Sequence, residues 1–264
     1  MLRAAWETAL DLVLPRTCPG CHAPVPWCDP CAATLTGRPR AVALPDAALD
    51  RLARAGLAAP PVHALTRYSG PVRAAVLAGK EHGRRDLPPL LGRALGTGLA
   101  RLQASGVLPT ELWLVPAPTR RSAARARGGD PVLAMARAAA AVLAAEGSPT
   151  GVARCLVLAR GTRDSVGLDA AQRAANLAGR VRFLPRGSPP PGAAVVLLDD
   201  VLTSGATVTA SLAALHGYGQ RVVGALVLAA VPALRPAVLG VAPATSRGAR
   251  EHDVGPCCAA PSGR

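Results

Sequence analysis

The amino-acid sequence predicts an α/β fold, with a doubly wound and mostly parallel sheet preceded by a small cysteine-rich module. Short apolar runs without alternation, typical of strands covered on both faces, alternate with longer stretches of helical periodicity. Strands that alternate with helices are typical of a parallel sheet between two helical layers. Four of the 7 cysteines gather near the N-terminus, apart from this pattern.

The composition along the chain indicates four parts. These are a helix and a cysteine module (1–35), a linker (36–61), the main α/β domain (62–240) and a disordered tail (241–264). The first part begins with an apolar-faced helix at 2–14, and the linker includes one helix-like stretch at 47–57. The tail is rich in Gly, Pro, Ser and Ala, which do not bury enough apolar surface to fold.

The strands and helices of the main domain follow from where apolar runs begin and end. Strands are predicted at 62–67, 111–115, 154–158, 180–183, 193–198 and 221–228, and helices at 70–80, 86–104, 131–146 and 206–215. The strand at 193–198 has no polar residue, as expected for the centre of a parallel sheet. The strand at 111–115 is followed by Pro116 and Pro118, and proline does not extend a hydrogen-bonded ladder.

The charge of the chain indicates which classes of partner it can bind. The 264 residues carry a formal net charge of +14, with 30 basic and 16 acidic residues, so the surface attracts polyanions and a nucleic-acid partner stays open. The few aromatic residues are scattered along the chain and are not interleaved with the arginines, which does not indicate a stacking platform for single strands. No apolar run reaches the roughly 18 residues that a membrane helix needs. The first residues lack a signal-peptide cleavage site, so we expect a soluble, cytoplasmic protein.

Two C-x-x-C pairs, six residues apart, indicate a metal site. Cys18, Cys21, Cys28 and Cys31 can close tetrahedrally on one Zn²⁺, and the glycine and prolines between them suit tight turns. Disulfides or a redox pair are the alternatives, but a reducing cytosol favours metal. We expect structural zinc, contributing on the order of 10 kcal/mol to folding. No function is assigned to the other cysteines, Cys155, Cys257 and Cys258.

Two adjacent acids and a hydroxyl-rich loop follow the strand at 193–198. Asp199 and Asp200 are expected at the carboxyl end of that strand, where the ligands of parallel α/β sheets bind. The loop residues that begin the next helix are Thr203, Ser204, Gly205, Ala206 and Thr207. Their backbone N–H groups and hydroxyls suit a phosphate, whereas the acids require sugar hydroxyls or a metal ion, so a sugar phosphate fits both. The alternative is that the acids and threonines only cap the helix.

Residues 195–207 resemble the phosphoribosyl pyrophosphate (PRPP) motif of type I phosphoribosyltransferases. The resemblance implies that Asp199 and Asp200 hold the ribose hydroxyls at the catalytic centre and that the loop binds the 5′-phosphate. It also implies Mg²⁺ on the pyrophosphate of PRPP. The fold expected from this resemblance is the same doubly wound sheet.

A second part of the site is expected where the strand at 111–115 ends. An arginine run follows, and arginine complements phosphate oxygens bidentately. The family resemblance implies a pyrophosphate loop here, which we assign to Pro118, Thr119, Arg120 and Arg121. The alternative is a solvated basic helix face. A polar stretch at 160–176 is either a lid over the site or an ordinary surface connection.

The cysteine pairs ahead of a PRPP motif resemble the ComF family, which is associated with bacterial DNA uptake. The resembling segments are 68–73, 77–80 with Lys80, 114–118 with the arginines up to 127, and Arg173, Asn176 and Leu177. After Gly128 this chain has Gly129-Asp130-Pro131, where that family usually has Phe-Asn-Gln. The resemblance implies a phosphoribosyltransferase with DNA-uptake machinery as a partner.

Three functions therefore agree with the sequence. The first is a Mg²⁺-dependent phosphoribosyltransferase, and the second is a non-catalytic sensor of PRPP or a nucleotide. The third is a nucleic-acid-handling adaptor in DNA uptake, in which the cysteine module and the arginines form the working surface. The sequence does not identify an acceptor for a phosphoribosyl group.

Overall fold

The computed structural model describes residues 16–119, 124–125, 128–159 and 179–231. The helix predicted at 2–14, the candidate lid at 160–176 and the tail at 241–264 lie outside the described residues. The same holds for Arg120 and Arg121 of the predicted pyrophosphate loop and for Arg173, Asn176 and Leu177.

The centre of the fold is a six-stranded sheet with the order β1-β2-β8-β7-β3-β4. Its strands are β1 (Arg40–Ala41), β2 (Val62–Arg67), β3 (Leu112–Pro116), β4 (Thr150–Val152), β7 (Ala194–Leu202) and β8 (Arg221–Ala230). All neighbouring pairs are parallel except β1 with β2. The central strand β7 is buried almost throughout, because helices cover both faces of the sheet. The predicted α/β fold with a mostly parallel sheet is confirmed.

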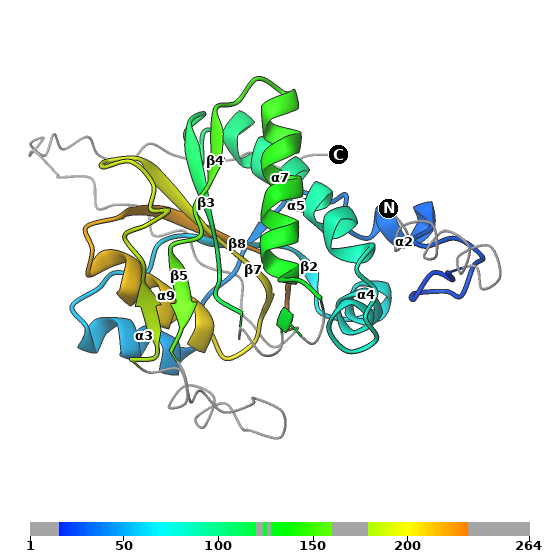
Figure 1. The fold of residues 1–264 in the computed structure, drawn as a ribbon, viewed down its shortest axis with the longest axis horizontal. Coiled ribbons are helices and arrows are strands. Elements are labelled where there is room, and N and C mark those ends of the chain that lie inside the picture. The colour runs from blue at the N-terminus through cyan, green and yellow to red at the C-terminus, as the bar shows by residue number, and fades with distance from the viewer. Residues whose placement is uncertain (1–15, 120–123, 126–127, 160–178, 232–264) are drawn as a thin grey trace, which may run out of the picture.

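Two helical layers enclose this sheet (Figure 1). One layer contains α4 (Gly70–Glu81), α5 (Leu87–Ala104) and α7 (Pro131–Ala145), and the other contains α3 (Asp46–Arg54) and α9 (Ala206–His216). Helices α5 and α7 approach closely at Gly92 and Gly96, where an added Cβ would lie 2.4 Å and 2.8 Å from the carbonyl oxygens of Met135 and Ala139. The small residues allow the two helices to bury a continuous leucine-rich face between them and the sheet.

Two predicted strands form outside the main sheet. β5 (Leu156–Leu158) and β6 (Val181–Phe183) pair antiparallel with each other as a separate two-stranded sheet. β6 has an exposed Arg182 between two buried residues, a pattern of a strand with one face in solvent, so it is unsuited to a doubly covered sheet. The edge position of the main sheet is taken instead by β4, which the sequence did not indicate as a separate strand.

The strand β7 is longer than predicted. We expected it to end at Leu198 with both acids beyond it, and that boundary was wrong, because Asp199 and Asp200 lie inside a strand that continues to Leu202. The long strand β8 supplies partners as far as Ala230, so the ladder persists on that side. On the other side β3 ends at Pro116, opposite Leu198. The acids therefore project past the end of β3 while β8 still holds their backbone.

Residues 36–61 contain β1 and the helix α3, which packs against α9. Ala48 and Leu52 are buried in the common core. The helix predicted at 47–57 ends at Arg54, because Gly56 takes a positive φ of 68° and the N–H of Leu57 bonds back to the carbonyl of Leu52. Toward the N-terminus, the cysteine module contains the short helix α2 (Asp29–Ala33).

Candidate functional site

The carboxyl ends of the four central strands β2, β8, β7 and β3 meet at one edge of the sheet. The N–H of Ala117, just after β3, donates a 2.7 Å hydrogen bond to the carbonyl of Leu198 in β7. The N–H of Tyr68, just after β2, donates a 2.6 Å bond to the carbonyl of Ala230 at the end of β8. The acids of β7 thus lie next to the start of the predicted pyrophosphate loop, at the edge where parallel α/β sheets bind ligands.

The acid pair, Asp199 and Asp200, is almost completely buried, at 7% and 6% exposure. The N–H of Asp200 donates a 2.8 Å hydrogen bond to Oδ1 of Asp199. Burial and the neighbouring carboxylate of Asp200 raise the pKa of Asp199 to about 7, although Lys80 acts to lower it. Two buried carboxyl groups so close together require a cation or hydrogen-bond donors to stay ionised.

Lys80 supplies such a cation. Its Nζ lies 2.6 Å from Oδ2 of Asp200, and the side chain reaches the acid from the last turn of α4. Burial acts to lower the pKa of Lys80, but the carboxylates of Asp200 and Asp199 outweigh it and raise that pKa. From the sequence, Lys80 was recognised only as part of a family resemblance, without a role. The sequence did not indicate its pairing with Asp200, because 120 positions separate the two residues.

The loop between β7 and α9 makes a sharp turn at Gly205. Gly205 takes a φ of 69°, which a residue with a side chain rarely adopts, and it turns the chain from the strand into α9 within three residues. Among the described residues no side chain caps the N-terminus of α9, so its first N–H groups have no side-chain acceptor there. Neither the acids nor the threonines of this loop cap α9 through a side-chain hydrogen bond. Ala206 and Thr207 form the first turn of α9.

Arg51 of α3 donates hydrogen bonds to this loop and to α9. Its Nη2 donates a 3.1 Å hydrogen bond to the carbonyl of Ser204, and its Nε donates a 3.4 Å bond to Oγ1 of Thr209. Burial lowers the pKa of Arg51. The sequence signal for this contact was absent, because Arg51 lies in the stretch that we assigned to a linker and is one arginine among many.

The described part of the predicted pyrophosphate loop, Pro118 and Thr119, follows β3 at the same edge. Oγ1 of Thr119 donates a 3.1 Å hydrogen bond to Oδ1 of Asp130. The same oxygen accepts the N–H groups of Val132 and Leu133, so Asp130 caps α7. The Gly-Asp-Pro segment that departs from the resembling family thus ties the start of this loop to a helix.

A scan against protein-family models matches residues 127–242 to the phosphoribosyl transferase domain. The match includes β7, the acid pair, the loop and α9. This part of the chain is therefore similar to the phosphoribosyl transferase domain. The matched range begins after Lys80 and the cysteines, so both lie outside it. A comparison with curated proteins gives no match.

Ahead of the phosphoribosyl transferase domain, the structure brings Cys18, Cys21, Cys28 and Cys31 into one cluster. Their sulfur atoms all lie within 4.8 Å of one another, and the described cysteines form no disulfide. Zinc–sulfur bonds of about 2.3 Å in a tetrahedron separate sulfurs by about 3.8 Å, so the cluster can hold such an ion. Burial raises the pKa of Cys31, and a bound cation would offset the cost of its thiolate. Cys155 is buried elsewhere, and burial raises its pKa to about 11.

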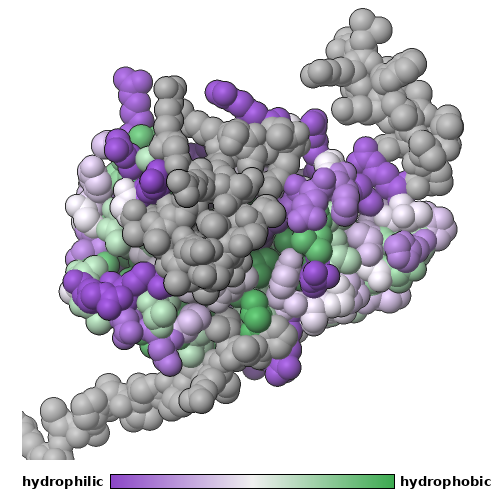
Figure 2. Space-filling view, turned by 90° about the horizontal axis from the view of Figure 1, so that it is seen from below, coloured by the Kyte–Doolittle hydropathy of each residue, from purple (hydrophilic) through white to green (hydrophobic). Residues whose placement is uncertain are grey.

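Other features of the described residues are less specific. On the part of the face in Figure 2 that is not grey, hydrophilic residues are spread around the rim, while hydrophobic residues show in a hollow between them. No helix among the described residues is long and apolar enough to cross a membrane. His63 is buried in β2, and burial lowers its pKa, as expected for a structural histidine.

Proposed function

We propose that this protein binds PRPP with Mg²⁺ at the carboxyl edge of its sheet and transfers the phosphoribosyl group to an acceptor. The observation that carries the proposal is the acid pair next to the uncapped N-terminus of α9, with Gly205 between them. A ligand that binds here needs an anionic group at the N-terminus of α9. It also needs groups that donate hydrogen bonds to the two acids. PRPP binding is typical of the phosphoribosyl transferase domain, and PRPP has both ends.

Each part of the ligand has a partner in this arrangement. The 5′-phosphate lies in the loop formed by Thr203, Ser204, Gly205, Ala206 and Thr207. The ribose hydroxyls donate to Asp199 and Asp200, and the pyrophosphate faces the loop from Pro118 to Arg121. When bound, Mg²⁺ would neutralise the pyrophosphate and assist its departure.

The burial of the acid pair suits transfer of a ribosyl group. Positive charge develops on the ribose carbon as the pyrophosphate leaves, and carboxylates at a site of low polarity stabilise that charge more than in water. Asp199 and Asp200 have little contact with solvent, so the same site keeps water from competing as the nucleophile.

Calorimetry with PRPP and Mg²⁺ tests this proposal. We expect saturable binding by the wild-type protein, and its absence would contradict both the transferase and the PRPP-sensor functions. Release of pyrophosphate in the presence of a panel of nucleobases then distinguishes an enzyme from a sensor, because a sensor binds PRPP without consuming it.

We further propose a ComF-like role in DNA uptake, with zinc as the metal of the cysteine cluster. The support for it is the cysteine cluster ahead of the phosphoribosyl transferase domain, together with a net charge of +14. An adaptor that handles nucleic acid would bind DNA with an affinity that falls as salt rises. A DNA-binding titration over a series of salt concentrations tests it, and no detectable binding at low salt would contradict it.

A further inference from the structure

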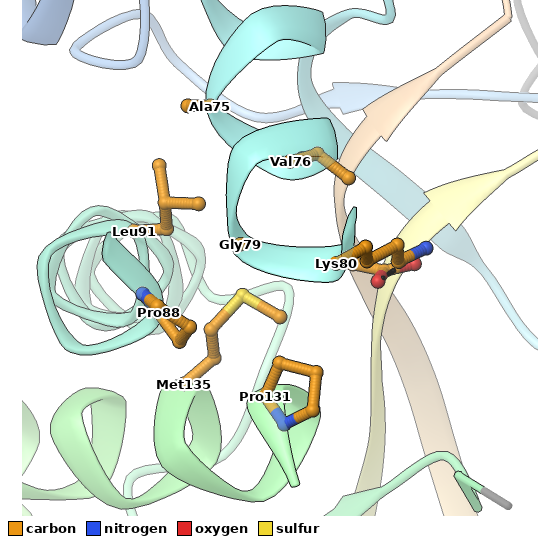
Figure 3. Close-up of a pocket in the computed structure, with 9 residues that line it drawn as sticks. Ala75, Val76, Gly79, Lys80, Pro88, Leu91, Pro131 and Met135 are labelled. Atoms are coloured by element: carbon orange, nitrogen blue, oxygen red, sulfur yellow. Dashed lines mark ion pairs between the residues drawn. The ribbon is translucent and has the colours of Figure 1, made fainter. Parts of the chain in front are cut away.

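The side chain of Lys80 joins helix α4 to the acid pair. Figure 3 shows it extending from the last turn of α4 toward the end of β7, where it pairs with Asp200. Its stem borders a cavity of about 10 Å³ between α4, α5 and α7, which Val76, Pro131 and Met135 help to line. The position of this cation at the site therefore depends on where α4 lies.

The turn that carries Lys80 is tied to Arg84 through the backbone. The carbonyl of Ala78, in the same turn, accepts the N–H of His82 at 3.1 Å and the N–H of Arg84 at 3.2 Å. Arg84 is thus held within one helical turn of Lys80, and a shift of Arg84 displaces the end of α4.

The side chain of Arg84 holds the cysteine knuckle, which we define as residues 18–31, together with the adjoining Thr17. Nη1 donates a 2.8 Å hydrogen bond to the carbonyl of Thr17, and Nη2 donates a 2.9 Å bond to the carbonyl of Pro26. Asp86 fixes the guanidinium by accepting Nε at 2.9 Å and Nη2 at 2.7 Å, and it also pairs with Arg16 at 3.0 Å. One planar group therefore connects the chain just before Cys18, the chain before Cys28 and the α4–α5 junction.

The knuckle also touches the other end of α4. An added Cβ at Gly20 would lie 2.7 Å from both Sγ of Cys31 and Cβ of Pro71, which stands in the first turn of α4. The knuckle thus contacts α4 at its first turn and at the junction after its last turn. A metal ion that orders the knuckle would order both contacts.

We propose that Lys80 is a positioning residue that holds the acid pair for PRPP, and that the cysteine knuckle sets the place of Lys80 through Arg84. This inference rests on the proposed function for the identity of the ligand. The contacts run from the backbone carbonyls of Thr17 and Pro26 to Arg84, from Arg84 to the last turn of α4, and from Lys80 to Asp200.

The placement of Lys80 can be measured without PRPP, because Lys80 is the sole lysine of the chain. Acylation of its amine by acetic anhydride, followed by mass spectrometry of its peptide, reports how firmly it is paired. We expect slow acylation in the metal-loaded wild type and faster acylation in Asp200→Asn, which removes the ionic partner. Arg84→Gln should also accelerate it several-fold while the metal content stays unchanged. Arg101→Gln is the matched control, because Arg101 donates to the carbonyls of Thr36 and Gly37, away from Lys80.

The effect on the ligand is measured by titration with PRPP and Mg²⁺. Lys80→Met should weaken PRPP binding about tenfold, because a charged hydrogen-bonding partner of the acids is lost. Lys80→Arg should restore part of the affinity. Arg84→Gln should weaken binding in the wild type but add little in the Lys80→Met background, since both changes act through the same side chain. Thermal unfolding of each variant identifies any that fail to fold, and Asp86→Asn then replaces Arg84→Gln.

The outcomes test the link from the knuckle to Lys80 separately from the role of Lys80 at the ligand. Unchanged acylation in Arg84→Gln beside fast acylation in Asp200→Asn overturns the link from the knuckle to Lys80. Wild-type PRPP affinity in Lys80→Met, or additive losses in the double variant, overturns the role of Lys80 at the ligand. Absence of PRPP binding by the wild type, with the expected acylation pattern, contradicts the proposed function but supports the contact chain.

Discussion

Gly205 lies against Ala48 so closely that a Cβ added to the glycine would be 2.9 Å from the Cβ of the alanine. Gly205 turns the chain into α9 at the candidate phosphate loop, and Ala48 is buried in α3, from the segment ahead of the main domain. Helix α3 therefore supports the phosphate loop directly. The same helix supplies Arg51, which bonds to Ser204 in that loop.

Gly205→Ala is expected to weaken both folding and phosphate binding. The substitution places a side chain at a φ of 69° and in contact with Ala48, so the free energy of unfolding should fall by about 2 kcal/mol or more. Gly219→Ala is the control, because Gly219 has a φ of 68° but no atom within 4 Å of an added Cβ. Chemical denaturation should give a clearly larger loss for Gly205→Ala, and equal losses would contradict the close packing.

Arg51→Met should loosen the phosphate loop without unfolding the protein. The loss of the bonds to Ser204 and Thr209 removes about 1 kcal/mol of stability and leaves the carbonyl of Ser204 unpaired. We expect PRPP affinity in calorimetry to fall several-fold. Arg54→Gln, an exposed position of the same helix, should bind PRPP as the wild type does. Equal affinities of the wild type and Arg51→Met would show that the loop holds its shape alone.

Asp199→Asn and Asp200→Asn should each reduce PRPP affinity at least tenfold, because each removes an acceptor of a ribose hydroxyl from a buried site. Glu111→Gln removes an exposed carboxylate just ahead of β3, at the opposite edge of the sheet, and serves as the control. Calorimetry with PRPP and Mg²⁺ measures all three. Wild-type affinity in both asparagine variants would remove the acid pair from the proposed site.

The pKa of Asp199 predicts how stability depends on pH. Folding raises that pKa from 3.8 to about 7, so between these values the unfolded chain has lost a proton that the folded protein keeps. The free energy of unfolding should therefore fall as pH rises from about 4 to about 7 and level off above. One pKa unit corresponds to about 1.4 kcal/mol, so the fall is on the order of a few kcal/mol.

Asp199→Asn should abolish this fall in the free energy of unfolding. Denaturant titrations of the wild type and of Asp199→Asn across that pH range measure the difference between the two proteins. The charged groups that act on Asp199, namely Asp200, Lys80 and Asp130, are present in both proteins, so the comparison keeps them constant. Parallel curves for the wild type and Asp199→Asn would contradict a raised pKa.

Metal analysis should find about one zinc ion per chain, held by the four clustered cysteines. Cys18→Ser should lose the metal and a large part of the folding energy of the knuckle, on the order of 10 kcal/mol for structural zinc. PRPP binding should weaken but persist, because the acid pair and the loop lie in the phosphoribosyl transferase domain. Cys155→Ala should retain the zinc, since Cys155 is buried outside the cluster. A metal-free wild type would contradict the assignment.

Local patterns were enough for much of this protein. The apolar run of β7, the proline that ends β3 and the glycine that begins α9 are signals of single segments, and they predicted the parallel sheet and its ligand-binding edge. The four cysteines were recognisable as a cluster from their spacing alone, because all of them lie within 14 residues. The family resemblance of residues 195–207 also depended only on contiguous residues.

Tertiary structure decided which distant residues complete the site. The acids stay within β7 because β8 continues beside them, and the pairing of β5 with β6 outside the main sheet depends on partners and not on composition. Lys80 meets Asp200, and Arg51 meets Ser204, only because helices from earlier in the chain pack at the edge of the sheet. The sequence by itself determined most of the helices and strands and the residue types of the loop that begins α9. Packing decided that Lys80 pairs with the acids and that α3 supports the loop. Such contacts leave no periodic or spaced pattern in the chain, so the sequence did not indicate them.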